Sequence, residues 1–159
     1  MKALNIKEPW ASLIVNGYKE YEFRGWKTKY REKILIHAGM SLERDMAKIE
    51  RDMAKIERDM AKIEIDMAKI ERDMAKRFDD YNLDYGFGEI IGEAELTDCI
   101  LITEEFMDNL KKKDPLVYGV TGHKMTYAWK LENVKKFNKR YFVKGKLSLW
   151  EFDIDNMDK

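Results

Sequence analysis

Three charged side chains whose types could act together lie within six residues of one another: Lys19, Glu22 and Arg24. They follow Gly17, which is placed to end a short helix and is followed by a predicted strand. On a regular strand Glu22 and Arg24 point to one face and Lys19 to the other, so Lys19 joins them only if the turn redirects it. The lysine and the arginine could hold a phosphate group, the arginine in bidentate fashion. Glu22 could orient Lys19 or accept hydrogen bonds from a base edge, and the alternative is a structural salt-bridge network.

The same side chains also permit a catalytic interpretation. A lysine can act as a general base when burial lowers its pKa. We expect the neighbouring Glu22 to raise the pKa of Lys19 instead. If the protein is an enzyme, Lys19 and Glu22 are the catalytic candidates.

Aromatic and hydroxyl side chains near the cluster extend the predicted ligand-binding set. Trp10 and Trp26 could stack on bases, although tryptophan on strands more often packs in a core. Ser12 lies in the predicted short helix and could donate to a ligand, or be a plain helix hydroxyl. We predict one solvent-accessible pocket at this place, lined by Trp10, Ser12, Lys19, Glu22, Arg24 and Trp26.

The sequence gives no sign of a metal or a cofactor. His37 and His123 are far apart and lack Cys or acidic residues at ligand spacing. Cys99 lies within an apolar strand, which is typical of a buried thiol rather than a nucleophile. There is no phosphate-loop or dinucleotide motif, so we expect neither a metal site nor a cofactor.

Charge is balanced in total but segregated along the chain. The 159 residues contain 30 basic and 30 acidic side chains, so the net charge is zero. Residues 1–35 carry 8 basic and 4 acidic side chains, residues 77–110 carry 1 and 10, and residues 111–146 carry 11 and 2. A fold that joins the first and third segments would have a basic face suited to a phosphate-bearing partner. Alternatively, the basic and acidic segments pair with each other or stay solvated.

The single cysteine and the lack of long apolar runs indicate a location. Cys99 cannot form an intrachain disulfide, which suits a reducing compartment. No signal peptide or membrane span is visible. We therefore expect a cytoplasmic protein without a membrane partner.

A seven-residue repeat occupies residues 44–78. Arg-Asp-Met-Ala-Lys-Ile-Glu occurs three times, followed by a fourth copy with one change and a partial fifth. Met and Ile recur at the a and d positions of a heptad, and no Gly or Pro intervenes, which predicts one helix at about 41–80 with Ser41 as its N-cap. The helix could form a coiled coil and a weak homo-oligomer, or be a duplication that the fold tolerates without a new function.

Outside the repeat, apolar residues alternate in short runs bounded by glycine turns. This pattern is typical of a compact β-barrel with helical crossovers. The predicted helices are 9–16 and 104–112, and the predicted strands are 3–6, 18–24, 32–38, 90–102, 125–134, 141–143 and 147–152.

Several segments in order resemble the ASCH (activating signal cointegrator homology) domain family of the PUA-like superfamily. Residues 17–24 resemble the family's signature G-x-K-x-x-E-x-R behind its short helix, 9–14. The further matching segments are Trp26, 88–92, 96–99, 127–133, 143–146 and Trp150. The resemblance implies an α+β fold, a PUA-like mixed β-barrel with short helices, in which residues 1–159 form a single domain and 41–80 are a helical insertion.

The resemblance also implies what the domain does. PUA-like barrels mostly serve RNA, so the implied partner is RNA, single-stranded nucleic acid or a nucleotide. One bacterial branch is instead an amidohydrolase that deacetylates acetylcytidine with Lys, Thr and Glu. Glu22 occupies the position of that threonine, three residues after Lys19, and Glu104 and Glu105 are only regional candidates for that glutamate. A coiled-coil interaction protein is the third possibility.

Overall fold

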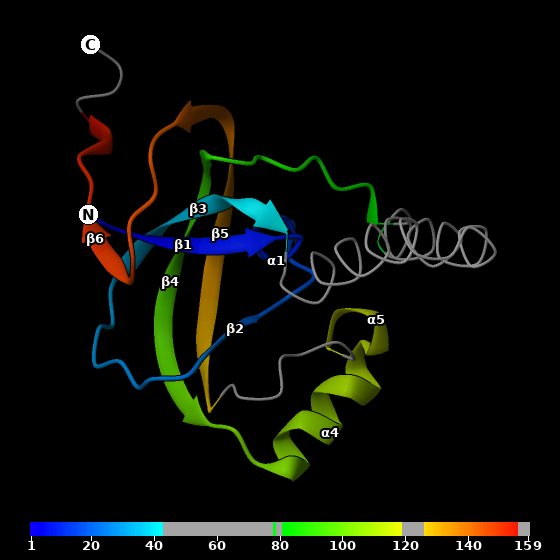
Figure 1. The fold of residues 1–159 in the computed structure, drawn as a ribbon. Coiled ribbons are helices and arrows are strands. Elements are labelled where there is room, and N and C mark those ends of the chain that lie inside the picture. The colour runs from blue at the N-terminus through cyan, green and yellow to red at the C-terminus, as the bar shows by residue number, and fades with distance from the viewer. Residues whose placement is uncertain (43–77, 79–80, 119–125, 156–159) are drawn as a thin grey trace, which may run out of the picture.

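The computed structural model describes residues 1–42, 78, 81–118 and 126–155 (Figure 1). These residues form one mixed sheet of six strands with three short helices beside it. Within them, no helix is long and apolar enough to cross a membrane.

The helix predicted at about 41–80 lies outside the described residues except at its start and at Phe78. At its start the prediction is wrong, because Ser41 and Leu42 still belong to a strand and Leu42 pairs with Glu8. Backbone pairing with β1 thus continues β3 into residues for which the local sequence favours a helix. Ser41 is not a helix N-cap.

The strands are joined in the order β2-β5-β4-β3-β1-β6. In the described part of the chain only β1 and β3 run parallel, and the other neighbours are antiparallel. Figure 1 shows β1 and β3 crossing the long β4 and β5 at a steep angle, so the sheet is strongly twisted. The sheet is open at β2 and β6, so the closed barrel is not confirmed; β6 is three residues long and pairs with β1. The strands are β1 (Lys2–Glu8), β2 (Tyr21–Arg24), β3 (Lys33–Leu42), β4 (Glu89–Leu101), β5 (Tyr127–Phe142) and β6 (Leu149–Glu151).

The helices are α1 (Trp10–Val15), α4 (Glu104–Lys113) and α5 (Pro115–Tyr118). Residues 11–15 of α1 are all buried, and α1 packs on a hydrophobic cluster formed by β1, β3, β4 and β5. Helix α4 begins where the Thr103 side chain accepts from the Phe106 amide at 3.1 Å, and acidic residues follow in its first turn. These two helices confirm the sequence prediction, whereas α5 was not predicted.

A single long strand, β5, replaces two predicted ones. It runs over 16 residues, although the sequence pattern predicts a break between residues 134 and 141. Pairing with β4 continues across this polar stretch, with register shifts and with Asn133 at φ 50°. At Gly92 of β4 an added Cβ would lie 2.6 Å from the Lys135 carbonyl oxygen and 2.8 Å from Val15, so only glycine permits this close approach.

Candidate ligand-binding site

The turn between α1 and β2 determines where Lys19 points. Gly17 ends the helix with φ +83°, a left-handed conformation that glycine adopts without strain. The backbone amide of Lys19 donates to the carbonyl of Leu13 at 3.2 Å, so Lys19 still belongs to the turn and precedes the strand. Strand alternation therefore does not apply to Lys19, and its side chain turns towards Glu22.

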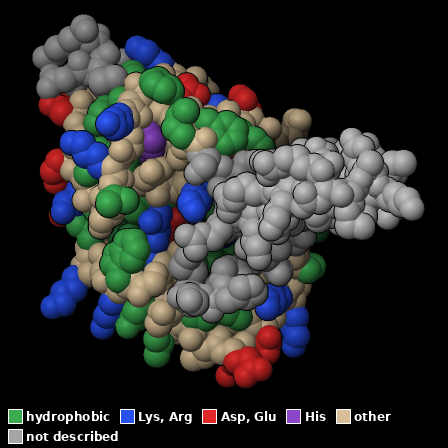
Figure 2. Space-filling view, in the orientation of Figure 1, with side chains coloured by type: hydrophobic (Ala, Val, Ile, Leu, Met, Phe, Trp, Pro, Cys, Tyr) green, Lys and Arg blue, Asp and Glu red, His purple; other side chains and the backbone are tan. Residues whose placement is uncertain are grey.

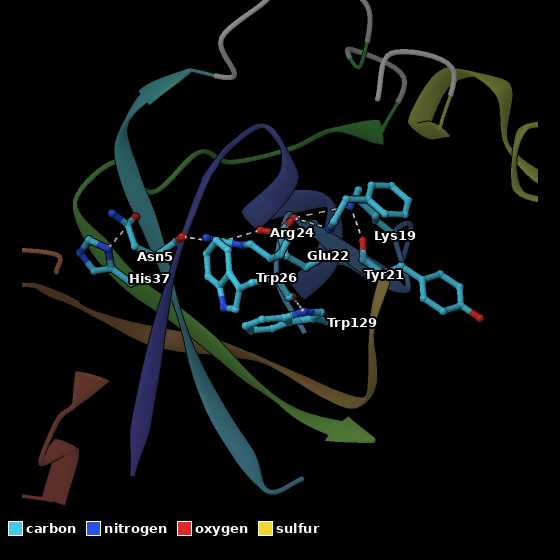
Figure 3. Close-up of polar contacts among 9 residues, drawn as sticks. Asn5, Lys19, Tyr21, Glu22, Arg24, Trp26, His37 and Trp129 are labelled. Atoms are coloured by element: carbon cyan, nitrogen blue, oxygen red, sulfur yellow. Dashed lines mark hydrogen bonds and ion pairs between the residues drawn. The ribbon is translucent and has the colours of Figure 1, made fainter. Parts of the chain in front are cut away.

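The three charged side chains lie together (Figure 3). Glu22 lies between the two cations, with Oε1 3.9 Å from Lys19 Nζ and Oε2 2.9 Å from Arg24 Nη2. Glu22 Oε1 also accepts from the backbone amide of Phe23 at 3.1 Å. Arg24 Nη2 also donates to the backbone carbonyl of Asn5 at 2.6 Å, which connects the cluster to β1.

Lys19 is buried although it carries an amine. It is 2% exposed, its Nζ lies 4.3 Å from the ring centre of Phe23 and 5.6 Å from that of Trp10, and it donates to the Tyr21 carbonyl. Burial lowers the pKa of Lys19 from 10.5 to about 8; Glu22 acts in the opposite direction, and the neighbouring guanidinium adds to the decrease. Glu22 does raise this pKa, as expected, but the net shift is downward because the desolvation of Lys19 outweighs the effect of the carboxylate.

The cluster is open to solvent at its arginine end. Glu22 is only 6% exposed, whereas the Arg24 side chain is 17% exposed and Trp26 is 44% exposed. Lys19, which contacts the other oxygen of Glu22, is more deeply buried than Arg24 and does not line an open pocket, contrary to expectation. A separate open depression in the described surface lies elsewhere, lined by Arg31, Glu32, Lys33, Glu95, Leu96 and Thr97.

Trp26 stands beside Arg24 as a partly exposed aromatic surface. The Arg24 guanidinium carbon lies 5.5 Å from the Trp26 ring centre, a cation–π geometry. Behind it, Trp129 packs edge-on at 5.7 Å and its Nε1 donates to the Trp26 carbonyl at 3.1 Å. This contact fixes the backbone at Trp26, and the ring remains accessible for stacking.

Two cations share one carboxylate in this nearly buried cluster. Within the described part of the chain, Glu22 is the acidic side chain that pairs with both Lys19 and Arg24. When Lys19 is protonated, the cluster has a net charge of one positive unit. Such a site favours an anion that carries a charge and several hydrogen-bond acceptors, as a phosphate does.

A family model described as the ASCH domain matches residues 4–141. The chain belongs to the ASCH domain family. This places it in the PUA-like superfamily, as the resemblance of its ordered segments implied. A comparison with curated proteins finds no match.

The two candidate residues on α1 of this ASCH domain have different surroundings. The Trp10 ring lies against Lys19 and packs edge-on against Phe78 at 6.0 Å. Ser12 is fully buried, and its hydroxyl donates to Glu8 at 2.6 Å. The hydrogen bonds of Ser12 thus direct it to Glu8 and away from the charged cluster.

A second polar group continues from the cluster along the sheet of the ASCH domain. His37 is buried; its Nε2 donates to the Val143 carbonyl at 2.8 Å and its Nδ1 lies 3.3 Å from the Asn5 side-chain oxygen (Figure 3). Asn5 thereby contacts both His37 and Arg24. Asn5 was not predicted as a site residue, although a polar residue between the apolar Leu4 and Ile6 of β1 could have indicated it.

Metal ligation has no support in the described residues, where no three His, Cys, Asp or Glu side chains converge. Cys99 is partly exposed rather than fully buried. His123 lies outside the described residues. The candidate site is therefore a cationic and aromatic one, and its chemistry depends on Lys19, Glu22, Arg24 and Trp26.

Proposed function

We propose that this ASCH domain binds RNA, or a nucleotide of the same chemistry, at the cluster of Lys19, Glu22 and Arg24. The single observation that supports this proposal most is the sharing of one carboxylate by two largely buried cations. Removing a charge from water without full pairing is costly, so the cluster gains from a bound anion. A phosphate supplies that charge at the exposed end of Arg24.

The roles of the side chains follow from their positions. Arg24 is partly exposed and meets the phosphate first, with N–H groups that Glu22 and Asn5 do not use. Trp26 lies next to that guanidinium and offers a ring on which a base can stack. Lys19, on the other oxygen of Glu22, contributes a buried positive charge that water does not screen.

The first prediction is that both cations are needed for binding. Replacing Arg24 with Gln removes a charge-assisted contact to the phosphate, and replacing Lys19 with Met removes the buried positive charge beside Glu22. Both substitutions keep much of the side-chain volume. Each substitution should weaken binding of a short single-stranded RNA by about 1.5–3 kcal/mol, roughly tenfold or more. Fluorescence anisotropy with a labelled oligonucleotide measures the loss.

Lys111→Met is the matched control, because Lys111 is an exposed lysine on α4. It should leave the affinity unchanged. Circular dichroism should show that all three variants remain folded. Equal affinity of the parent and of both site variants would exclude the cluster as the binding site.

A second candidate function is favoured by the pKa of Lys19. A lysine with a pKa of about 8 is partly deprotonated near neutral pH and can act as a general base. In this second function the ASCH domain hydrolyses the amide of an acetylated pyrimidine nucleoside. Lys19 accepts a proton from the water that attacks the amide carbonyl and returns it to the leaving nucleoside amine as the C–N bond breaks and acetate forms, while Glu22 positions the Lys19 amine. Release of acetate from acetylcytidine by the parent, and its loss in Lys19→Met, would establish this activity.

Self-association through residues 41–80 and a cytoplasmic location remain predictions. Of residues 41–80, the structure describes Ser41 and Leu42, which belong to β3, and Phe78. Analytical ultracentrifugation of the whole chain would measure any weak homo-oligomer.

A further inference from the structure

The loop between β5 and β6 lies beside the proposed binding site. Its first carbonyl, that of Val143, accepts from His37 Nε2 at 2.8 Å. At Gly145 an added Cβ would come within 2.8 Å of the His37 ring and 3.0 Å of the Asn5 side chain, so the loop backbone packs directly on both residues. Because the Asn5 carbonyl accepts from Arg24, the loop is separated from the cluster by one residue.

This loop carries exposed positive charge. Lys144 and Lys146 flank Gly145 and are both exposed. Lys7, two residues beyond Asn5 on β1, is exposed as well, as strand alternation requires. Among the described residues, no acidic side chain forms an ion pair with any of these three lysines. Figure 2 shows Lys and Arg side chains over this loop and in the middle of the same face.

The surface formed by Lys7, Lys144 and Lys146, which we call the loop surface, joins the two basic segments of the sequence. Lys7 comes from residues 1–35 and the other two from residues 111–146. The pairing of β1 with β6 and the contact of Gly145 with Asn5 bring these segments together. This face is therefore basic, although the chain as a whole has no net charge.

We infer that the loop surface binds the phosphate backbone of a single-stranded nucleic acid whose end nucleotide occupies the cluster at Arg24. This inference rests on the proposed function and extends it, since it makes the ligand a polynucleotide rather than a free nucleotide. Exposed lysines neutralise successive phosphates without reading sequence. A single strand fits better than a duplex, because a base that is paired and stacked within a duplex is not free to stack on Trp26 beside Arg24.

An anionic membrane is the other polyanion that exposed lysines could meet. Phe142 and Leu147 are strongly exposed beside the loop, and such side chains also insert into lipid headgroups. A nucleic acid is favoured because the loop surface continues into the cluster, which contains a nearly buried lysine and glutamate. A flat lipid surface makes no use of groups at that depth, whereas a single nucleotide does.

The experiment compares ligand length in the parent and in the double variant Lys144→Glu/Lys146→Glu. Uridine 5′-monophosphate tests the cluster alone, and unstructured oligouridylates of two to ten nucleotides test the loop surface. In the parent, affinity should rise more steeply than in proportion to the number of nucleotides, which is the increase expected if a longer strand only offers more positions to bind. In the double variant, the mononucleotide affinity should stay within about twofold, while the longest oligonucleotide should bind about tenfold more weakly.

The salt dependence gives an independent readout. Each lost phosphate contact lowers the slope of log affinity against log salt by about 0.7 for a single strand, so two lysines should remove about 1.4. Lys111→Glu/Lys112→Glu on α4 is the control for net charge and should leave length dependence and slope unchanged. Circular dichroism confirms that both double variants are folded.

The possible failures are distinguishable. If the parent binds the mononucleotide but gains nothing with length, the loop surface is wrong and the proposed function stands. If Lys144→Glu/Lys146→Glu weakens oligonucleotide binding while Lys19→Met and Arg24→Gln do not, the cluster is not the binding site. The inference that the end nucleotide lies at Arg24 is then wrong as well. Binding of the parent to vesicles rich in phosphatidylserine, without binding to any oligonucleotide, would overturn the inference in favour of a membrane.

Discussion

Lys19 combines an ionisable amine with surroundings that disfavour its charge. Its Nζ lies over the Phe23 ring and near Trp10, and water reaches it hardly at all. The charged form persists because Glu22 is 3.9 Å away and the backbone carbonyl of Tyr21 accepts a hydrogen bond from Lys19 Nζ. The balance places the pKa of Lys19 at about 8, where the protonation state changes in an accessible pH range.

Anion binding should therefore depend on pH above neutrality. A bound phosphate favours protonated Lys19, so affinity should be constant below pH 8 and fall above it, approaching tenfold per pH unit. A dinucleotide of adenine and cytosine without terminal phosphates is a suitable probe, because it does not itself titrate in this range. The decrease should be absent in Lys19→Met, and a decrease that persists there would assign the titration to another group.

The folding stability should change with pH in the opposite sense. The pKa of Lys19 is 10.5 in the unfolded chain and about 8 in the folded protein, so between these values the unfolded state binds more protons. The free energy of unfolding should consequently rise as pH increases from 8 to 10.5, by up to about 3 kcal/mol, and this gain is lost as pH falls through 8. Urea unfolding of the parent and Lys19→Met at several pH values measures it, and identical pH profiles would contradict it.

Helix α1 is held at its beginning by a buried carboxylate. Glu8 accepts from the Ser12 amide at 2.8 Å, from the Ser12 hydroxyl at 2.6 Å and from the Gly86 amide at 2.9 Å. These bonds join the end of β1, the first turn of α1 and the loop before β4. The carboxylate thus satisfies donors that the start of a helix leaves without partners.

Replacing Ser12 with Ala should separate a structural role from a ligand-binding one. It removes one donor to Glu8 in a fully buried site, so the free energy of unfolding should fall by about 1–3 kcal/mol. Nucleotide affinity should stay unchanged. Urea unfolding combined with anisotropy tests both statements, and a loss of affinity without a loss of stability would return Ser12 to the binding site.

The sequence predicted those helices and strands that are determined by residues close together in the chain. Gly17 ends α1 because of its own backbone, and the apolar run before residue 102 forms β4 as expected. The continuity of β5 depends on pairing with β4, which the polar sequence after Asn133 does not reveal. The burial of Lys19 likewise depends on rings of Trp10 and Phe23, which strand alternation does not place together.

On the scale of the whole molecule, we expect the described fold to form without the heptad units at 44–71. Residues on either side of 44–71 form the six strands and the hydrophobic clusters of the described structure. The repeat enters between β3 and β4, which pair with each other directly. An insertion between paired elements costs mainly the entropy of a longer connection, which grows slowly with length.

Deleting residues 44–71 should leave a soluble protein that unfolds cooperatively. The deletion removes four whole seven-residue units and joins Glu43 to Arg72, which preserves the phase of the repeat. Calorimetry should show a single transition, and RNA affinity should match that of the parent. Insoluble expression or a broad, non-cooperative transition would show that the repeat is part of the folding unit.

The contact between His37 and Asn5 provides a reporter for nuclear magnetic resonance. The His37 ring is buried, donates to Val143 and touches the residue whose carbonyl holds Arg24. A phosphate that pulls on the guanidinium should alter this chain of contacts and shift the imidazole nitrogen frequencies of His37. His123→Gln removes the second histidine signal, so occupancy of the site could be followed without attaching a label to the protein or to the nucleic acid.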